Sequence, residues 1–314
     1  MNLPWLKAHQ HDFNDSLMRS RLGHAPLIHG PAGLGKRRLA RWLVARILCL
    51  EPTDSQPCGR CRSCQLLQGQ THPDRFIAAI PEDKTQVTVD VIRELSRGLQ
   101  LTPAVGPSRV GLLEEADRMN QNAANALLKT LEEPAPSAWL VLVSDRPEVL
   151  PATILSRCQK VAVHPPQTEH GLDWLRAEMP QAESERLALA LEVAGGAPLR
   201  AKELITSKTL DFGLEIRAAL LDAARHKRIP PGLIEPWAER AEEAWHWLAY
   251  WVRQWTGSSL GLGEDEPAAM DTRGLTELWQ QALRGRGLAD GSIRADLLLG
   301  KWLLEWIAVV DRKG

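Results

Sequence analysis

The chain has 314 residues, 44% of them apolar, and a formal net charge of −1. This length allows two or three domains that each bury a core of their own. The first residues lack the regions of a secretion signal and no apolar stretch is long enough for a membrane span, so we expect a cytoplasmic protein without membrane contact. The balanced charge argues against a protein that binds nucleic acid over its whole surface.

Apolar runs with the length of buried strands alternate with helical patterns up to about residue 165. Leu39, Leu43, Ile47 and Leu50 have the spacing of one helix face, and Ala123–Glu133 is rich in helix formers. Such alternation predicts an α/β fold with a parallel sheet and flanking helices. The expected strands are Ala25–His29, Arg75–Ile80, Arg109–Glu114, Ala138–Ser144 and Lys160–Val163.

The first expected strand is followed by GPAGLGKR, which resembles a phosphate-binding loop. Gly30, Gly33 and Gly35 would let backbone N–H groups approach phosphates. Lys36 would reach toward the terminal phosphates. The next position normally carries a Ser or Thr that coordinates magnesium, but here it is Arg37, whose guanidinium has no lone pair for a metal. We expect metal-assisted hydrolysis to be lost, whereas the sequence leaves open whether ATP still binds.

Four of the five cysteines lie close together in CLEPTDSQPCGRCRSC. Four thiolates at this spacing, with Gly and Pro to turn the loop, predict a tetrahedral structural zinc site. An iron–sulfur cluster is the alternative, although the closely following fourth Cys with its Pro is absent, and free thiols are a third interpretation. The predicted ligands are Cys49, Cys58, Cys61 and Cys64.

The stretch RVGLLEEADRMN places Glu114 and Glu115 at the end of an apolar strand. In nucleotide-hydrolysing proteins of this type the strand ends in Asp-Glu, where the Asp holds magnesium and the Glu orients water. The extra methylene of Glu114 would displace the metal-side carboxylate, so the pair is interpreted as a degenerate site. A solvated strand end is the alternative. Ser144 could touch a phosphate or simply end its strand.

The stretch ATILSRCQK places Arg157 in a Ser-Arg-Cys triplet just before the last strand. On spacing alone, an Arg here is more often a surface or salt-bridge residue than a functional one. Cys158, outside the cysteine cluster, is interpreted as a buried small hydrophobe.

Beyond Pro166 the strand pattern stops and helices broken by Gly and Pro follow. Eight of the twelve Trp lie in the last third of the chain, where core or oligomer packing is a better explanation than a binding surface. The segment Gly257–Thr272 is predicted to be an exposed loop.

Together these residues resemble the clamp-loader branch of the AAA+ ATPases. The resemblance rests on GPAGLGKR, the four-cysteine insertion followed by THPD, the run NAANALLKTLEEP, and TILSRC. It covers the first 165 residues well and the remainder by arrangement alone. It implies an AAA+ P-loop domain over residues 1–165 with a zinc module inserted at 49–64, a small helical lid over 166–207, and an all-α collar domain for oligomerisation over 208–314.

The resemblance also implies roles for single residues. In this family the Arg of the SRC triplet is an arginine finger that reaches the nucleotide of the adjacent subunit, a catalytic role in trans that falls on Arg157. The lid of active relatives carries an Arg that senses nucleotide; the matching position here is Leu199, with Arg200 displaced by one. Departures therefore gather where the chain would use ATP itself, whereas the residue offered to a neighbour is intact.

We therefore expect a non-hydrolysing stator of the DNA polymerase III clamp loader, without catalysis of its own but part of a DNA-directed DNA polymerase holoenzyme. The implied partners are gamma/tau and delta subunits in a hetero-pentamer, the sliding clamp, and primer-template DNA through the complex. Two alternatives remain. One is an active ATPase of the gamma/tau type. The other is a zinc-dependent nucleic-acid-binding module with Arg60 and Arg62 as phosphate contacts. Its binding of nucleic acid should be weak, because it has so few cations.

Overall fold

The computed structural model describes residues 3–53, 56–259, 271–288 and 294–311. The chain divides into two compact units, residues 1–203 and 204–314, and each is described by itself. None of the described helices combines the length and apolar character that a membrane crossing requires. The division into three domains is not tested by these two units and stays a prediction.

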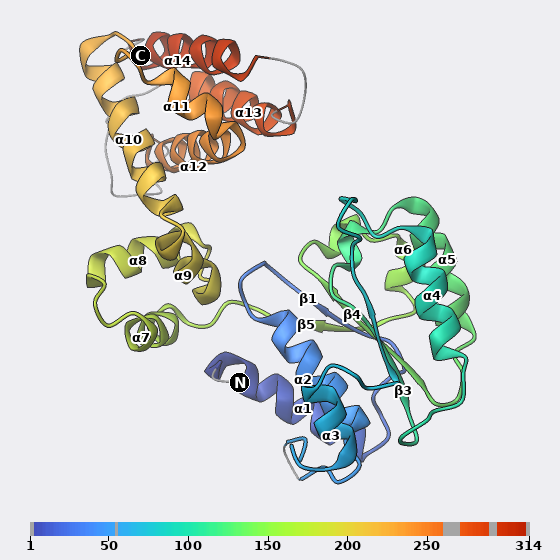
Figure 1. Ribbon diagram of the computed structural model, residues 1–314. Coiled ribbons are helices and arrows are strands. Elements are labelled where there is room, and N and C mark those ends of the chain that lie inside the picture. The colour runs from blue at the N-terminus through green and yellow to red at the C-terminus, as the bar shows by residue number, and fades with distance from the viewer. Residues whose placement is uncertain (1–2, 54–55, 260–270, 289–293, 312–314) are drawn as a thin grey trace. The chain divides into compact units, whose positions relative to one another are not determined.

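Five parallel strands form the sheet of the first unit, in the order β2-β3-β4-β1-β5 (Figure 1). All five expected strands are present, with ends shifted by at most two residues. Because the strands are parallel, the loops that follow β1, β3 and β4 leave the sheet at the same edge. The strands are β1 Pro26–His29, β2 Arg75–Ala78, β3 Arg109–Leu113, β4 Ala138–Ser144 and β5 Gln159–Ala162.

Helices cover both faces of this sheet. Figure 1 shows α1 and α2 on one side of the strands and α4 and α5 on the other. On α4, Ile92, Leu95 and Leu99 have the spacing of one helix face, and all three are buried in the core cluster. The helices are η1 Pro4–Leu6, α1 Lys7–Met18, α2 Lys36–Leu48, α3 Arg62–Gln68, α4 Val89–Leu99, η2 Ala116–Arg118, α5 Gln121–Glu132, η3 Pro147–Val149 and α6 Ala152–Leu155.

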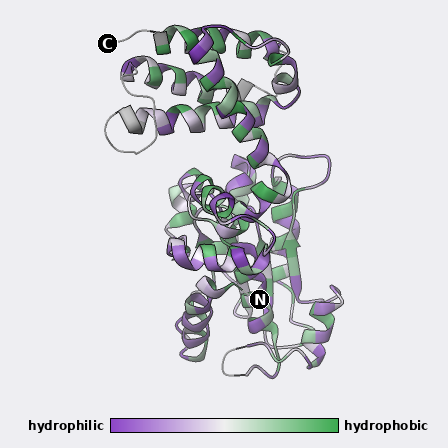
Figure 2. Cartoon of the chain, turned by 90° about the vertical axis from the view of Figure 1, so that its left-hand side faces the viewer, coloured by the Kyte–Doolittle hydropathy of each residue, from purple (hydrophilic) through white to green (hydrophobic). Residues whose placement is uncertain are grey.

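Three further helices follow the sheet, α7 Thr168–Glu178, α8 Ser184–Val193 and α9 Pro198–Thr206. They contact the start of the chain: the rings of Trp5 and Trp174 meet edge to face with centroids 5.3 Å apart. Figure 2 shows that the helices carry both hydrophilic and hydrophobic residues, as helices with one buried face do.

The second unit consists of helices packed around tryptophan. Trp247, Trp255, Trp302 and Trp306 are each less than 2% exposed, which agrees with the packing interpretation. The rings of Trp255 and Trp306 stack with centroids 5.0 Å apart. Its helices are α10 Thr209–His226, α11 Ile234–Glu239, α12 Ala241–Ser259, α13 Thr272–Leu288 and α14 Ala295–Asp311. A parallel α/β sheet followed by a helical region confirms the predicted fold class.

Two local predictions need correction. Leu50 is not on the face of α2, because the helix ends at Leu48 and the extended backbone of Cys49 turns the chain into the cysteine loop; Leu50 is 41% exposed. The predicted loop over 257–272 begins too early, because residues 257–259 continue α12, and it ends too late, because Thr272 begins α13. Residues 260–270 lie outside the described part of the chain.

Candidate functional site: a degenerate phosphate loop, an exposed arginine and a four-cysteine module

The glycines of the phosphate loop are required by its geometry. Gly33 and Gly35 have φ of 80° and 85°, in the left-handed region that side chains disfavour. A Cβ on Gly33 would lie 2.4 Å from the Cβ of Arg200, and the N–H of Leu199 donates to the Gly33 carbonyl at 3.1 Å. The start of α9 therefore packs directly on the loop. Gly30 has φ of 140°, and a Cβ there would meet the Val163 carbonyl oxygen at 2.1 Å.

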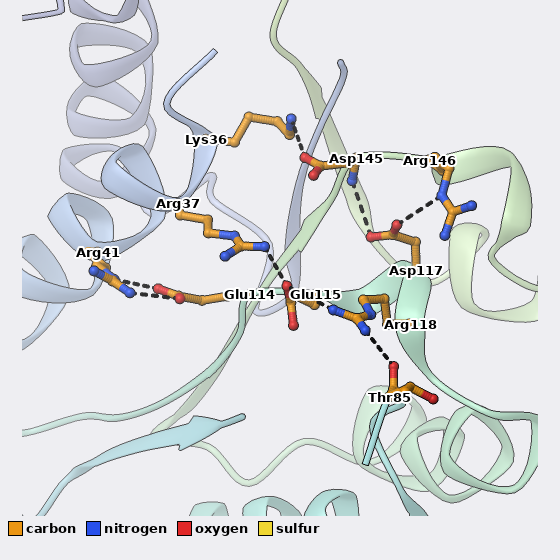
Figure 3. Close-up of polar contacts among 10 residues, drawn as sticks. All are labelled: Lys36, Arg37, Arg41, Thr85, Glu114, Glu115, Asp117, Arg118, Asp145 and Arg146. Carbon is orange, nitrogen blue, oxygen red and sulfur yellow. Dashed lines mark hydrogen bonds and ion pairs between the residues drawn. The ribbon is translucent and has the colours of Figure 1, made fainter. Parts of the chain in front are cut away.

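Lys36 is buried, and its side chain reaches back across the loop to Pro31 and Asp145. It begins α2 and is only 3% exposed. Its Nζ lies 2.6 Å from Asp145 Oδ1 and donates to the carbonyl of Pro31 at 2.5 Å (Figure 3). The charge that would meet terminal phosphates is thus neutralised by a carboxylate of the same chain.

The acidic pair after β3 is also committed to internal partners. Glu114 accepts hydrogen bonds from Nε and Nη2 of Arg41, and Glu115 lies 2.6 Å from Nη2 of Arg37 (Figure 3). The bond from Nη2 of Arg41 is 2.8 Å long. Both arginines project from the first turns of α2, so the residue that stands in the magnesium position pairs with the residue that would orient water. Both carboxylates, of Glu114 and Glu115, are therefore paired with an arginine.

A second carboxylate network lies beside the first. Asp117 accepts the N–H of Asp145 at 3.2 Å and lies 3.3 Å from Nε of Arg146 (Figure 3). Asp145, Asp117 and Arg41 belong to the site although no sequence motif singled them out. Asp145 carried a usable signal, because it directly follows a predicted strand at the sheet edge where the phosphate loop lies. Arg41 carried one as well, one helical turn after Arg37 on the same face.

The remaining candidate residues near the loop are Ser144, Leu199 and Arg200. Ser144 is fully buried at the end of β4, its carbonyl accepts the N–H of Gly30 at 3.3 Å and its Oγ accepts the N–H of Arg146 at 3.2 Å. The Nη1 of Arg200 lies 2.8 Å from Glu203, one turn further along α9. The guanidinium of Arg200 is therefore held by its own helix, and the apolar Leu199 is the residue that packs toward Gly35.

Arg157 lies in the turn between α6 and β5 and reaches the surface. Its side chain is 36% exposed, and its Nη2 lies 2.7 Å from Oε1 of Glu132 at the end of α5. The next residue behaves differently. Burial raises the pKa of the Cys158 thiol to about 11, and its side chain packs against the core cluster. Of the triplet, the arginine is presented outward and the cysteine inward.

The structure brings the four clustered cysteines together, with all four Sγ atoms within 4.8 Å of one another. The Sγ of Cys49 lies 3.9 Å from that of Cys61 and 3.6 Å from that of Cys64, and Cys58 and Cys64 are 3.9 Å apart. Four sulfurs about 2.3 Å from one tetrahedral ion would lie about 3.8 Å from each other. The thiols therefore fit one metal ion, whereas a cluster with several irons would hold them farther apart.

Backbone donors support the thiolates of this module. The N–H of Cys58 donates to Cys49 Sγ and the N–H of Cys61 to Cys58 Sγ, both at 3.3 Å. Hydrogen bonds from the backbone of Arg60 and then Cys61 lower the pKa of Cys58, which favours the deprotonated form that a metal binds.

The THPD segment connects the cysteine module to the sheet. Ser63, between two of the cysteines, bonds the Nε2 of buried His72 at 2.8 Å. The Nδ1 of His72 accepts the N–H of Asp74 at 3.1 Å, and Asp74 in turn lies 3.3 Å from the Nη2 of Arg109 at the start of β3. The module is thereby anchored at the end of the sheet opposite the phosphate loop.

The chain is similar in sequence to several DNA polymerase III subunits. The chain is 43% identical to DNA polymerase III subunit delta-prime of Pseudomonas aeruginosa over 186 residues, which are 59% of this chain and 57% of the relative. It is 34% identical to the Escherichia coli delta-prime subunit over 251 residues, 78% of this chain and 73% of the relative. A tau/gamma subunit of Haemophilus influenzae is 37% identical over 145 residues, 46% of this chain and 20% of the relative.

The match to the Pseudomonas relative thus spans less than two thirds of that protein, whereas the Escherichia coli match spans almost three quarters. The family described as DNA polymerase III, delta subunit, matches residues 6–167, a little over half of the chain. This segment contains the phosphate loop, the four cysteines and the Ser-Arg-Cys turn. The chain therefore belongs to this DNA polymerase III family, alongside the delta-prime subunits that it resembles over most of its length.

Proposed function

We propose that this chain is the delta-prime subunit of a DNA polymerase III clamp loader, a stator that does not hydrolyse ATP itself and supplies Arg157 to the ATP site of a neighbouring subunit. The observation that carries the proposal is the contrast in charge pairing. Lys36 is buried and paired with Asp145, and Arg37 and Glu115 pair with each other beside the loop. Arg157 also has a partner in the chain, Glu132, but this single pair lies at the surface in the turn before β5, where a neighbour can meet it.

The internal pairs explain why turnover would be lost. A bound nucleotide with magnesium needs Lys36 on its phosphates and a carboxylate near the metal. Here Arg37 brings a positive charge into the metal position, and its pair with Glu115 occupies the group that would orient water. Losing one preorganised contact typically costs about 3 to 4 kcal/mol of transition-state stabilisation, so two lost contacts remove most of the rate.

The partners in this proposal are gamma/tau and delta subunits in a hetero-pentamer joined by the helical collar, the sliding clamp, and primer-template DNA through the complex. The likeness to delta-prime and tau/gamma subunits of DNA polymerase III supports this part of the proposal. The work of such a complex is to load the clamp at a primed site in the cytoplasm. We assign assembly to the collar at residues 208–314. We assign the covering of the phosphate loop to the lid at residues 166–207.

Zinc is the metal we assign to Cys49, Cys58, Cys61 and Cys64. A site of four thiolates leaves no open position for a substrate, so the ion would be structural. Replacing Cys64 with Ser should remove the metal and lower the free energy of unfolding by several kcal/mol, because metal binding contributes directly to folding. Cys158→Ser is the matched control, since it removes a thiol outside the module. Metal analysis that finds iron, or no metal in freshly prepared protein, would contradict the assignment.

An active ATPase of the gamma/tau type is the second candidate, favoured by the likeness to tau/gamma subunits over 46% of this chain. A titration of the purified chain with a fluorescent ATP analogue, with and without magnesium, separates the two candidates when hydrolysis is measured in parallel. The stator should turn over negligibly and gain no affinity from magnesium. Turnover at the rate of an ordinary AAA+ ATPase would favour the second candidate.

The zinc-module alternative, in which Arg60 and Arg62 bind nucleic acid, has less support. Arg60 is 83% exposed at its side chain but lies 3.8 Å from Glu51, whose carboxylate offsets its charge. An Arg60→Ala, Arg62→Ala double variant of the full chain should bind DNA as the unmodified chain does. A large loss of salt-dependent DNA binding would revive this alternative.

A further inference from the structure

Arg157 is held on its own chain by three contacts. Its Nη1 donates to the carbonyl of Thr153 at 3.0 Å and to Oγ of Ser156 at 3.3 Å. Its Nη2 lies 2.7 Å from Oε1 of Glu132, which is the last residue of α5. The Nη1 contacts are local to the turn, whereas the carboxylate comes from a different helix. Glu132 is therefore the one group among these three that joins the arginine to a separate element.

The atom that Glu132 contacts decides what the arginine can bind. A guanidinium recognises a phosphate best through two parallel hydrogen bonds. It offers two such forks, one formed by Nη1 with Nη2 and one formed by Nε with Nη2. Nη1 already donates to Thr153 and Ser156, so the fork open to a phosphate is the one formed by Nε with Nη2, and its Nη2 lies against Glu132. A phosphate bound through that fork competes with this carboxylate.

The pair is also weak enough to be displaced. The side chains of Arg157 and Glu132 are 36% and 49% exposed, and ion pairs in such surroundings contribute little and are screened by salt. A terminal phosphate carries more charge than one carboxylate, so it would compete well for the same nitrogen. The contact can thus hold the guanidinium in place and still be exchanged.

We propose that Glu132 is a positioning residue that holds the Arg157 finger against α5 until a phosphate on the adjacent subunit displaces its carboxylate. This inference rests on the proposed function, in which Arg157 acts on a neighbour's nucleotide. It assigns to Glu132 a role in setting how easily that nucleotide recruits the finger. Removing the carboxylate should therefore favour recruitment, not impair it.

The test uses a reconstituted clamp loader with Glu132→Gln, and with Glu133→Gln as the matched control. Glu133 is the next residue, is exposed, and has no ion pair in the described part of the chain. Both changes remove one charge and keep the side-chain size. Glu132→Gln should tighten binding of a fluorescent ATP analogue at the adjoining site by about two- to five-fold, the range that a weak exposed ion pair allows. Glu133→Gln should leave it unchanged.

Two further readouts separate positioning from a structural role. The gain should shrink as salt is raised from about 50 mM to 500 mM, because screening weakens the original pair. Glu132→Asp, which keeps the charge, should bind nucleotide more nearly as the unmodified complex does. The unfolding temperature of each isolated variant, measured alongside, should differ from the parent by no more than about 2 °C.

The outcomes distinguish this inference from the function on which it rests. The gain must vanish in the Arg157→Ala background, where there is no finger to release. If Arg157→Ala slows hydrolysis but Glu132→Gln and Glu133→Gln behave alike, or if Glu132→Gln weakens nucleotide binding, the inference about Glu132 is wrong and the finger stands. If Arg157→Ala itself changes nothing, the proposed function fails, and the inference fails with it.

Discussion

The phosphate loop and the Ser-Arg-Cys turn belong to the same α/β unit and each carries a cation paired with a carboxylate, but the two cations differ in burial. At the loop, Lys36 is 3% exposed and lies 2.6 Å from Asp145, while Arg37 and Arg41 neutralise Glu115 and Glu114. At the turn, the Arg157 side chain is 36% exposed and pairs with one carboxylate, that of Glu132, which is itself partly exposed to solvent.

The two sites differ in the ion pairs that would break when a phosphate binds. At the loop, a nucleotide phosphate would have to draw the buried ammonium group of Lys36 away from Asp145, which is costly because that group is shielded from water. At the turn, only one weak exposed pair is exchanged. Under the proposed function, the chain would therefore bind nucleotide poorly itself and donate an arginine to a neighbour.

Arg157→Ala should produce the largest effect and tests the donor half of this contrast. Arginine fingers contribute about 10³ to 10⁵ in rate where chemistry is limiting, although a complex with several ATP sites would show less in bulk. Single-turnover hydrolysis by the assembled complex is the measurement, and assembly and metal content should be normal. Lys should rescue poorly, because it lacks the planar fork.

Arg176→Ala is the control for that prediction. Arg176 is an exposed arginine on α7 whose partner is Asp173 at 3.0 Å, so its removal changes the net charge equally. An unchanged burst at every site in the Arg157→Ala complex would remove the finger from the mechanism and leave a scaffold.

The reactivity of Cys158 sharpens the contrast within the triplet itself. A thiol with a pKa near 11 has roughly 100-fold less thiolate at pH 8 than one with the ordinary pKa of 9.0. Iodoacetamide should therefore label the Cys158 peptide about 100-fold more slowly in the folded chain than in urea, as followed by mass spectrometry. The folded rate should still rise tenfold per pH unit above pH 9.

The same shift fixes the sign of a stability effect. The folded thiol has the raised pKa, so the unfolded chain loses its proton first as pH increases. The contribution of Cys158 to stability is complete below pH 9 and declines between about pH 9 and 11. A labelling rate that levels off near pH 9 would show that the thiol is not shielded.

Restoring the metal position tests the other half of the contrast. The double variant Arg37→Thr, Glu114→Asp supplies a hydroxyl and a shorter carboxylate for magnesium. With magnesium, it should bind a fluorescent ATP analogue about ten-fold more tightly than the unmodified chain does. Without magnesium, the two chains should bind the analogue with equal affinity. Arg38→Thr is the control, because Arg38 is the adjacent exposed arginine of α2. Equal affinities with and without magnesium for the double variant would mean that internal pairing alone does not exclude the nucleotide.

Asp145→Asn should have the smallest effect. Removing the carboxylate that holds Lys36 should raise affinity for the ATP analogue about three-fold, whether or not magnesium is present, and lower the free energy of unfolding by about 1 kcal/mol. Asp90→Asn on α4, where the carboxylate is 84% exposed, is the control in the same titration and denaturation measurements. A variant that binds no better would show that Lys36 is kept from phosphate by its packing and not by its charge partner.

Much of the fold could be predicted from the sequence because strand and helix patterns are local. Each buried strand is a short apolar run bounded by turns, and the spacing of Leu39 and Leu43, both buried, marks one helix face. The errors lie where local patterns end. Leu50 continues the periodicity of α2 by count, but Cys49 turns the chain because its thiol must face the other three.

The candidate site divides in the same way. The residues that depart from a working ATP site, Arg37 and Glu114, are visible by identity, and so are the four cysteines by spacing. The charge pairs beside the loop are not visible in the sequence, because Arg37 and Glu115 lie 78 residues apart and no periodicity links them. Asp145 could have been suspected from its strand end, but not its contact with Lys36.

The sequence by itself determined the chemistry this chain has: a phosphate loop without its hydroxyl, four thiols in one short segment and an arginine in the SRC triplet. Those are properties of residue type and spacing, which need no fold to be recognised. Only the tertiary structure decided how the charges are paired, because the parallel sheet brings the ends of β1, β3 and β4 to one edge, where α2 presents its arginines to their carboxylates. Which carboxylate an arginine pairs with depends on which groups lie within about 3 Å of it, and folding alone sets those distances.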